Sequence, residues 1–271
     1  MQALRNITDV NTYDHIYLSP HPDDAVLSCG GRIWQQMRAG GHVLVVTIFG
    51  SIPAPNAPLS SFAQGLHVRW GHTADAAIQR QEEDLAALTL LGAVTAHWPY
   101  TDCIYRQTPD GRFPYASEES LWEQVHPAEK VLIIELAARI RALPLNQGGT
   151  IYAPLAVGHH VDHQITRQAA EASRQSLMYY EEYPYAEDVQ AVREALAEGL
   201  WQARPTWLSE QALQAKIAAI ARYRSQLSTF WTDEAEMATK VRVFAARTGG
   251  GRLAEQYWIR EPGCRPQADG D

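Results

Sequence analysis

The fold of the chain is most strongly constrained by one junction near the N-terminus. There an apolar, strand-like run is followed by a polar turn and then by a helical pattern. Residues 15–18 are His-Ile-Tyr-Leu, and the turn that follows, residues 19–24, is Ser-Pro-His-Pro-Asp-Asp. In open α/β sheets, ligands bind in the crevice at the carboxyl ends of the strands. A strand that passes into a helix at this junction would place His21, Asp23 and Asp24 in such a crevice.

A second group of metal-ligating residue types lies in the other half of the chain. Residues 150–155 are strand-like, and the sequence His-His-Val-Asp-His follows at residues 159–163. The carboxyl ends of parallel strands lie on one edge of a sheet, so the two groups can face each other across one crevice. Imidazole and carboxylate are ligands for zinc and similar divalent ions. The two groups therefore indicate a divalent-metal site and a metal-dependent hydrolase.

Strand-like and helix-like segments alternate along most of the chain. The expected strands are residues 15–19, 42–49, 94–100, 150–155, 178–184 and 256–259. The expected helices are residues 24–39, 74–91, 129–143, 162–176, 209–227 and 233–246, and Leu85, Leu88 and Leu91 share one face of the second helix. This alternation is typical of a parallel sheet covered by helices. The predicted fold is α/β, with a Rossmann-like open, mostly parallel sheet and helices on both faces.

Two long loops, residues 50–71 and 101–118, interrupt the alternation. Loops of this length in a compact domain are usually functional or mobile, and both follow expected strands, so we expect them to rim the crevice. Aromatic residues in these loops, in their flanks and in the segment 179–207 suit stacking on sugar rings, although scattered aromatics are more often core residues. They include Trp70, Trp98, Tyr100, Tyr105, Trp201 and Trp207. We expect one domain over residues 1–260 and a flexible C-terminal tail at 261–271.

The composition argues against several classes of protein. Apolar residues make up 46% of the chain and charged residues 20%, which allows a sizeable core. The net charge of -8 argues against a nucleic-acid or anionic-membrane partner, because binding phosphate requires clustered lysine and arginine. The sequence has no apolar run long enough for a membrane span, and its N-terminus lacks the apolar core of a secretory signal.

The cysteines favour a cytoplasmic location. Cys29, Cys103 and Cys264 are odd in number and widely spaced, which does not favour a disulfide framework. They form no Cys-x-x-Cys pair, so a zinc site built from thiolates is not expected either. We therefore expect a protein of a reducing cytoplasm.

His21, Asp24 and His163 are the expected metal ligands. His21 and Asp24 are three residues apart, so they lie on one side of the first helical turn. Three protein ligands with an open position are the pattern of a catalytic zinc, whereas structural zinc sites are closed by four ligands. Iron, manganese or cobalt would also suit two imidazoles and one carboxylate. Alternatively, the Pro-Asp-Asp turn serves only as a helix cap, and His160 and His163 form an ordinary surface pair.

Three further residues have expected catalytic roles. Asp23 lies between the two expected ligands in sequence and should point elsewhere, which makes it the candidate general base for a water whose pKa the metal lowers. His160 is the candidate to stabilise the developing oxyanion or to protonate the leaving amine. Asp162 would hold an imidazole in a useful tautomer and orientation. His159 is expected to be a bystander.

The two groups resemble the signature of the LmbE-like/PIG-L family of zinc-dependent deacetylases, which act on N-acetylglucosaminyl and related N-acyl sugars. The family has a His-Pro-Asp-Asp box after the first strand, here residues 21–24, and a Gly-x-His-x-Asp-His box, here residues 158–163. The resemblance implies that His21, Asp24 and His163 bind Zn²⁺, that Asp23 is the base and that His160 assists catalysis.

Weaker similarity to the family extends along most of the chain. Arg80 begins an Arg-x-x-Glu pattern whose arginine contacts sugar hydroxyls in the family, and Asp102 falls where a substrate-binding aspartate is expected. Residues 216–226 resemble the family's late Lys…Ser-Gln helix. Alternatively, Arg80 forms a salt bridge with Glu83 or Asp84 on its own helix, and Asp102 is a turn residue.

The sequence thus predicts a hydrolase that removes an N-acyl group, with N-acetyl favoured, from an amino sugar or glycoconjugate. Two alternatives stay open: hydrolysis of another amide or an ester, and a sugar- or nucleotide-binding domain without turnover. Gly30-Gly31 lie about two turns into the expected helix, and the chain has no Gly-x-Gly-x-x-Gly motif of a dinucleotide-binding fold. The pair therefore predicts close packing of this helix rather than a nucleotide site. An oligomer is compatible with the sequence, which does not define the sugar or the physiological metal.

Overall fold

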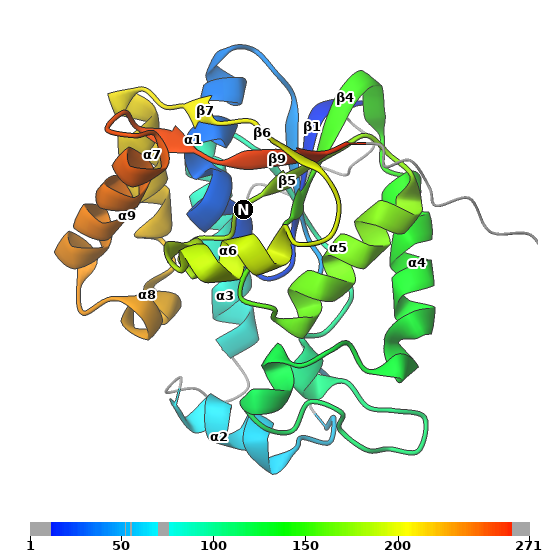
Figure 1. Cartoon of the computed structure of the whole chain (residues 1–271). Helices are drawn as coiled ribbons and strands as arrows, with labels where there is room; N and C mark the ends of the chain where they lie inside the picture. Colours follow the sequence, from blue (N-terminus) through cyan, green and yellow to red (C-terminus); the bar gives the residue numbers. More distant parts are fainter. Residues whose placement is uncertain (1–11, 52, 55, 70–75, 262–271) are drawn as a thin grey trace, which may run out of the picture.

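A single seven-stranded sheet forms the centre of the molecule (Figure 1). The computed structural model describes residues 12–51, 53, 54, 56–69 and 76–261. The strand order is β3-β2-β1-β4-β5-β9-β6, and the pairs from β3 to β5 are parallel, whereas β9 is antiparallel to both β5 and β6. The strands are β1 (Tyr13–Ser19), β2 (Val43–Thr47), β3 (Val94–His97), β4 (Leu145–Pro154), β5 (Leu177–Tyr180), β6 (Trp201–Ala203) and β9 (Tyr257–Arg260). The predicted open, mostly parallel α/β sheet is confirmed.

Helices cover both faces of the sheet because the strand side chains alternate between two apolar layers. Tyr17 of β1 packs into the layer formed with α1, α3, α7 and α9, while Ile16 and Leu18 pack into the layer formed with α4, α5 and α6. The helices are α1 (Asp24–Arg38), α2 (Ser61–Arg69), α3 (Ala76–Leu91), α4 (Lys130–Arg141), α5 (Val161–Ser173), α6 (Val189–Ala195), α7 (Glu210–Ile220), α8 (Arg224–Phe230) and α9 (Glu234–Thr248). Burying each such leucine or isoleucine contributes about 1.5–3 kcal/mol. None of the helices in the described ranges is both long and apolar enough to cross a bilayer.

The edge of the sheet at which the sequence places the crevice lies where the order of the strands reverses. β1 and β4 are parallel neighbours, yet α1 leaves β1 toward one apolar layer and α5 leaves β4 toward the other. A crevice at the carboxyl ends of two such strands is the usual ligand site of an open α/β sheet. Below this edge of the sheet, α2 and the segment 101–129 form a lobe, drawn in cyan and green in Figure 1. The segment 101–129 contains the short helices η1 (Cys103–Tyr105), η2 (Glu119–Trp122) and η3 (Pro127–Glu129).

The expected helix at residues 209–227 is wrong in one respect, because the structure divides it into α7 and α8. The break lies at Tyr223, whose hydroxyl donates a 2.7 Å hydrogen bond to the buried Asp84 carboxylate of α3. Asp84 also explains why the expected leucine face of α3 is only partly right. Asp84 takes an inward position with Leu88 and Leu91, whereas Leu85 is 47% exposed.

Several elements were not expected from the sequence. α2 lies inside the expected loop 50–71, and α6 lies inside the segment 179–207. β4 begins at Leu145 rather than at residue 150, and a separate ribbon pairs β7 (Thr206–Trp207) with β8 (Ala254–Glu255). Apart from Glu261, the expected tail 261–271 lies outside the described residues, as do Trp70 and Cys264. The division into a domain at 1–260 and a tail stays a prediction.

The Gly30-Gly31 pair permits close packing on α1, as the sequence predicts. A Cβ atom added to Gly31 would lie 2.7 Å from Leu208 Cδ1 and 3.0 Å from Glu255 Oε1. The Glu255 carboxylate accepts hydrogen bonds from the Gly31 and Arg32 amides, at 2.9 and 3.0 Å. Lys216 Nζ, 2.9 Å from the same carboxylate, donates to the Ser28 carbonyl. The buried ion pair of Lys216 and Glu255 thus hydrogen-bonds two backbone amides and one backbone carbonyl in the middle of α1.

We expect Gly31→Ala to lower the free energy of unfolding by about 1–3 kcal/mol, because the added methyl group overlaps Leu208 and Glu255. Urea denaturation monitored by circular dichroism measures the change. Gly65→Ala in α2 is the matched control, since an added Cβ there has no atom of the described residues within 4 Å. That control should be neutral or stabilising by about 0.5–1 kcal/mol. Equal effects of the two substitutions would contradict the packing argument.

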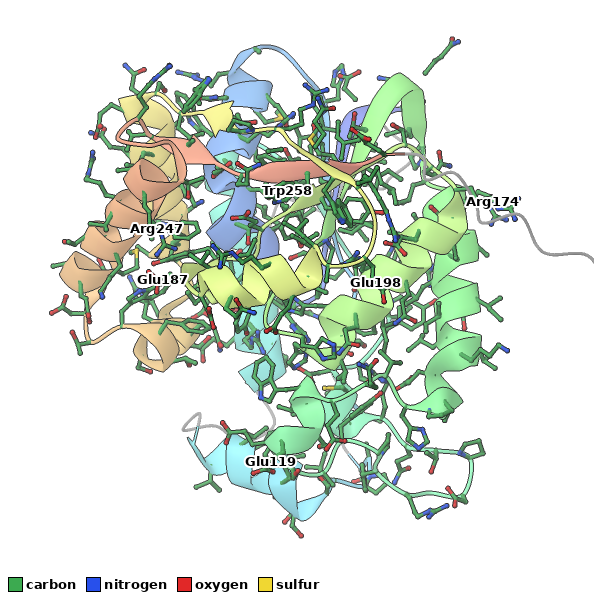
Figure 2. The ribbon with its side chains drawn as sticks, viewed as in Figure 1. Glu119, Arg174, Glu187, Glu198, Arg247 and Trp258 are labelled. Atoms are coloured by element: carbon green, nitrogen blue, oxygen red, sulfur yellow. The ribbon has the colours of Figure 1, made fainter. Side chains whose placement is uncertain are left out.

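Glu181 provides a second test of the packing, at the end of β5. Burial raises the pKa of Glu181 to about 7, even though Trp258 Nε1 donates a 2.8 Å hydrogen bond to its carboxylate. Trp258 is labelled on β9 in Figure 2. The native state therefore binds more protons at Glu181 than the unfolded state does between about pH 4.5 and about pH 7. This contribution to stability is complete below the unfolded pKa and is lost as the pH rises through the folded pKa.

We expect wild-type protein to lose about 2 kcal/mol more stability than Glu181→Gln between about pH 5 and about pH 8. Glutamine retains an acceptor for Trp258 but does not ionise. Urea midpoints at the two pH values measure the difference. Glu198→Gln, on an exposed loop labelled in Figure 2, should behave as wild type. A pH dependence that is unchanged in Glu181→Gln would contradict the assignment.

Candidate metal-dependent active site

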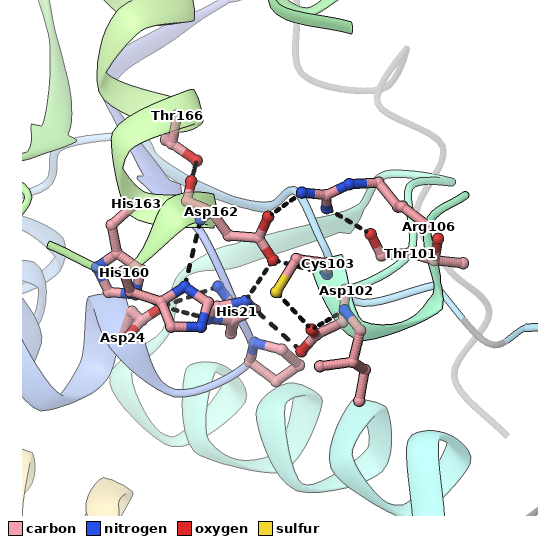
Figure 3. Close-up of polar contacts among 12 residues, drawn as sticks. His21, Asp24, Thr101, Asp102, Cys103, Arg106, His160, Asp162, His163 and Thr166 are labelled. Carbon is pink, nitrogen blue, oxygen red and sulfur yellow. Dashed lines mark hydrogen bonds and ion pairs between the residues drawn. The ribbon is translucent and has the colours of Figure 1, made fainter. Parts of the chain in front are cut away.

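The ends of β1 and β4 bring the two sequence groups into one buried cluster (Figure 3). His21 follows β1 directly and Asp24 is the first residue of α1, while His160 precedes α5 and His163 lies in its first turn. All four residues are at most 9% exposed. The sequence expectation that His163 lies near the His-Pro-Asp-Asp turn therefore agrees with the geometry.

Two imidazoles converge on one carboxylate oxygen of Asp24. Asp24 Oδ2 lies 3.4 Å from His21 Nδ1 and 3.3 Å from His163 Nε2, and it also accepts a 2.8 Å hydrogen bond from the His21 amide. Burial acts to raise the pKa of Asp24, but His163 and His21 outweigh it and hold that pKa well below its ordinary value. Asp24 is therefore a carboxylate in the folded protein.

The cluster has the donor set of a divalent transition-metal site. Ligand-type atoms of His21, His160 and His163 lie within 4.8 Å of one another. Two further such groups are Cys103, His160 and Asp162, and His21, Asp102 and Asp162. Burial acts to lower the pKa of His21, yet hydrogen bonds to Asp162 and Asp24 raise it well above its ordinary value. The carboxylates that favour an imidazolium there would equally favour a bound cation. Buried imidazole and carboxylate together fit zinc and neighbouring metals.

Asp23 stands beside this donor set in a strained backbone conformation. Its φ angle is 105°, a region that favours glycine, and its side chain is buried. Burial, followed by the charge of Asp24, raises the pKa of Asp23 to about 7. Among the described residues Asp23 makes no side-chain cap to α1, because Ser19 Oγ accepts the Ala25 amide instead, at 3.0 Å. The alternative that the Asp-Asp pair serves only as a helix cap is therefore not favoured.

His160 is fixed by its position at the start of α5. Its Nδ1 accepts a 3.2 Å hydrogen bond from the Asp162 amide, which assigns the proton of the neutral ring to Nε2. Burial, followed by the charge of His21, lowers the pKa of His160 to about 3. The ring of His160 lies 5.0 Å from that of His21, centroid to centroid. His160 is thus a neutral imidazole that can donate through Nε2.

Asp162 contacts the imidazole of His21 rather than that of His160. Its Oδ2 lies 3.0 Å from His21 Nε2 and accepts the Cys103 amide, while its Oδ1 accepts a 2.6 Å hydrogen bond from Arg106. The side chain of Asp162 is fully buried. Burial acts to raise the pKa of Asp162, but Arg106 and His21 hold it well below its ordinary value. Asp162, the carboxylate expected to orient an imidazole, thus contacts the ring of His21.

Arg106 and Glu182 belong to the site but escaped the sequence analysis. Arg106 donates to both Asp162 and Glu129, and it comes from the loop 101–118, whose sequence has no recognisable pattern. Glu182 Oε1 lies 3.1 Å from His163 Nδ1, and Glu182 Oε2 accepts the Val157 amide. A carboxylate behind a candidate ligand fixes the ring orientation. The signal for Glu182 was its place just after β5, beside the edge that carries the site.

Arg80 and Asp102 both lie at the cluster. Arg80 leaves α3 toward the His-Pro-Asp-Asp turn, with its NH2 atom 3.3 Å from the Pro22 carbonyl and 3.7 Å from Asp23 Oδ2. The alternative of a salt bridge to Glu83 is not favoured, because Glu83 accepts from Ser225. Arg80 Nε is a buried donor with no hydrogen-bond partner in the described part of the chain.

Asp102 has a geometry compatible with both roles that the sequence left open. Its Oδ1 accepts the Ile104 amide and so caps η1, as a turn residue would. Its Oδ2 lies 3.6 Å from His21 Nε2 and so faces the cluster. The two readings of this aspartate are compatible because each uses a different oxygen.

The expected rim aromatics mostly lie elsewhere. Trp98 is 5% exposed in the core, and Trp201 and Trp207 lie on β6 and β7, away from the crevice. Three other aromatic rings do contact the cluster: Trp122, at 5.1 Å from the ring of His160, Tyr185, at 5.8 Å from the ring of His163, and Phe49, at 6.3 Å from the ring of His21. The sequence could not single out these rings, since none of them lies in a motif.

A family comparison decides the class of this protein. The model of the PIG-L family, the GlcNAc-PI de-N-acetylases, matches residues 16–173, which is more than half of the chain and includes both His/Asp groups. The chain belongs to the PIG-L family. It is therefore a deacetylase, an enzyme that hydrolyses an amide bond.

Individual PIG-L relatives resemble the chain over nearly its whole length. The 2'-N-acetylparomamine deacetylase of Niallia circulans is 27% identical over 263 residues, which cover 91% of this chain and 90% of that relative. The zinc-inhibited form of teicoplanin deacetylase Orf2 superimposes with a TM-score of 0.78 at 29% identity, covering 92% of this chain and 98% of the other. The A40926 pseudoaglycone deacetylase Dbv21 gives a TM-score of 0.69 at 28% identity, covering 94% and 100%.

We expect Arg106→Leu to destabilise the deacetylase by about 3–5 kcal/mol, because it leaves Asp162 and Glu129 as buried charges without their cation. Thermal and urea unfolding measure the loss. Arg112→Leu is the matched control from the same loop, since Arg112 pairs with Asp110 on the exposed surface. The control should change stability by less than about 0.5 kcal/mol. Similar losses for the two variants would contradict the role given to Arg106.

Proposed function

We propose that this PIG-L deacetylase removes the N-acetyl group from an amino-sugar unit of a small molecule or glycoconjugate, with Zn²⁺ as its cofactor. The observation that carries the proposal is the convergence of His21 and His163 on Asp24 beside the buried Asp23. The name of the Niallia circulans relative, a 2'-N-acetylparomamine deacetylase, supports an N-acetylated substrate. Membership in an enzyme family argues against the alternative of a sugar-binding domain without turnover.

The proposed zinc ligands are His21, Asp24 and His163. Glu182 supports His163 through Nδ1, and Asp162 supports His21 through Nε2, so each imidazole has a carboxylate behind it. A divalent ion bound there supplies positive charge that acidifies a water molecule and polarises the amide carbonyl. The remaining steps belong to side chains of the protein.

Asp23 is the proposed general base. Its carboxylate accepts a proton as water attacks the carbonyl carbon, and it can return this proton to the nitrogen when the amine leaves and acetate forms. The NH2 atom of Arg80 lies 3.7 Å from Asp23 Oδ2, so its positive charge partly compensates the negative charge of Asp23. A positioned base of this kind typically contributes about 10²- to 10⁴-fold in rate.

His160 is proposed to stabilise the oxyanion of the tetrahedral intermediate. The hydrogen bond from the Asp162 amide to its Nδ1 leaves Nε2–H as the donor, and the low pKa of His160 keeps the ring neutral. A neutral imidazole can donate to the developing negative charge. It is a poorer acid for the amine, so of the two roles expected from the sequence this geometry favours oxyanion stabilisation.

Arg80 and Asp102 are proposed to bind the sugar. Arg80 Nε offers a buried donor that a substrate hydroxyl can satisfy, and Asp102 Oδ2 offers an acceptor beside His21. The donor comes from α3 and the acceptor from the loop that follows β3. Two such contacts would fix the orientation of the ring that carries the amide.

We expect Asp23→Asn to retain zinc and to lose about 10²- to 10⁴-fold in kcat, because the amide cannot accept the proton. His21→Ala should lose zinc as well as activity. Elemental analysis of purified protein, together with release of acetate from N-acetylglucosamine and its glycosides, measures both outcomes. His42→Ala, on the exposed surface, is the matched control and should keep zinc and activity. Full activity of Asp23→Asn would remove it as the base.

The substrate class is tested by a panel of N-acetyl amino sugars, N-acetyl amino acids and simple esters. Turnover of the amino sugars above the other classes supports the proposal. Turnover of an ester with failure on every amino sugar would overturn it in favour of the alternative that the sequence left open.

A further inference from the structure

Trp122 occupies a position at the crevice that the proposed mechanism does not use. Its ring lies 5.1 Å from the ring of His160 and 5.8 Å from that of Tyr185, at interplanar angles of 81° and 65°. Although it contacts His160 of the buried cluster, Trp122 is 38% exposed. A large apolar ring is thus partly open to solvent directly beside a proposed catalytic histidine.

The segment that carries Trp122 is tied to the start of α5. The Trp122 carbonyl lies 3.0 Å from His159 Nδ1, and Gln164 Nε2 donates a 2.8 Å hydrogen bond to the Glu123 carbonyl. These contacts join the lobe below the sheet, where Glu119 is labelled in Figure 2, to the helix that bears His160 and His163. The indole is therefore held in place relative to the reacting centre. His159, expected to be a bystander, contributes to this attachment.

The chemistry of the indole fits one kind of substrate surface. Tryptophan offers a broad, rigid apolar face with few rotatable bonds, and such faces attract the C–H face of a ring-shaped ligand. The other strongly exposed tryptophan of the described residues, Trp207, is 45% exposed but stacks under Arg252, whose guanidinium lies 4.2 Å from its ring. Trp207 belongs to the ribbon β7–β8, remote from the crevice, and so provides a natural comparison.

We infer that Trp122 stacks on the pyranose ring of the substrate and makes the enzyme select a cyclic amino sugar over an open-chain amide. This inference rests on the proposed function and adds a specificity-determining residue to it. The ring adjacent to the amide would lie against the indole while the amide reaches the cluster of His21, Asp24 and His163. An open-chain polyol presents no continuous ring face to the indole, so it forfeits this contact while retaining its hydroxyls and its amide.

The test compares N-acetylglucosamine with N-acetylglucosaminitol, its reduced, open-chain form, in the zinc-loaded 271-residue chain. For Trp122→Ala we expect KM for the cyclic substrate to rise about tenfold, while KM for the open-chain substrate and both kcat values change little. The ratio of the two KM values should therefore fall toward one. Trp122→Phe should recover most of the discrimination, and Trp207→Ala should behave as wild type.

Four results would overturn the inference. Equal rises of KM for both substrates would show that the indole does not distinguish the ring. A fall in kcat with unchanged KM would show that Trp122 acts through His160 alone, and thermal unfolding of the variants separates this result from a loss of fold. Failure of wild-type enzyme on every N-acetylhexosamine would overturn the proposed function, and this inference with it, whereas normal turnover with unchanged discrimination in Trp122→Ala overturns the inference alone.

Discussion

The parallel pairing of β1 with β4 is the constraint on which the rest of the site depends. Their register aligns Ile16 with Ile151 and Tyr17 with Tyr152, so the two strands end at nearly the same level of the sheet. The Tyr17 and Tyr152 rings stack 4.1 Å apart and reinforce this register on one face. The helices that follow, α1 and α5, pack on opposite faces of the sheet. The ends of β1 and β4 are therefore adjacent, and two short motifs more than a hundred residues apart in sequence become neighbours.

Charge balance explains the surroundings of the cluster. Asp23, Asp24 and Asp162 are each at most 6% exposed, and ionised groups buried to this degree require partners. Asp162 has Arg106 on one oxygen and His21 on the other, so its charge is compensated within the protein. Asp24 instead faces two imidazoles that need not be charged, and a cation held between them and Asp24 would complete the balance. Arg106, from a loop without sequence pattern, is therefore as important to the site as the motif residues.

The sequence predicted the parts of the molecule that depend on local pattern. The strands of the parallel sheet, the starts of α1 and α5 and the proximity of His21, Asp24 and His163 follow from apolar runs and residue spacing. It failed where a distant contact decides the local structure. The hydrogen bond from Tyr223 to Asp84 breaks the expected helix at 209–227, and Trp122 reaches the crevice through the path of a long loop. Neither contact can be predicted from the sequence around the residues that make it. The partner of Asp162 was likewise not predictable from the sequence: its carboxylate contacts the ring of His21 rather than that of His160.

The backbone of Asp23 illustrates how an active site can oppose the stability of its own fold. A positive φ costs an aspartate on the order of 1–3 kcal/mol, whereas glycine adopts such a conformation without that cost. Stability alone would therefore favour a glycine at this turn, which lacks the carboxylate proposed as the general base. The surrounding helix and strand must therefore offset this cost, and with Asp23 as the proposed base, engineering for heat resistance would leave its strained backbone unchanged.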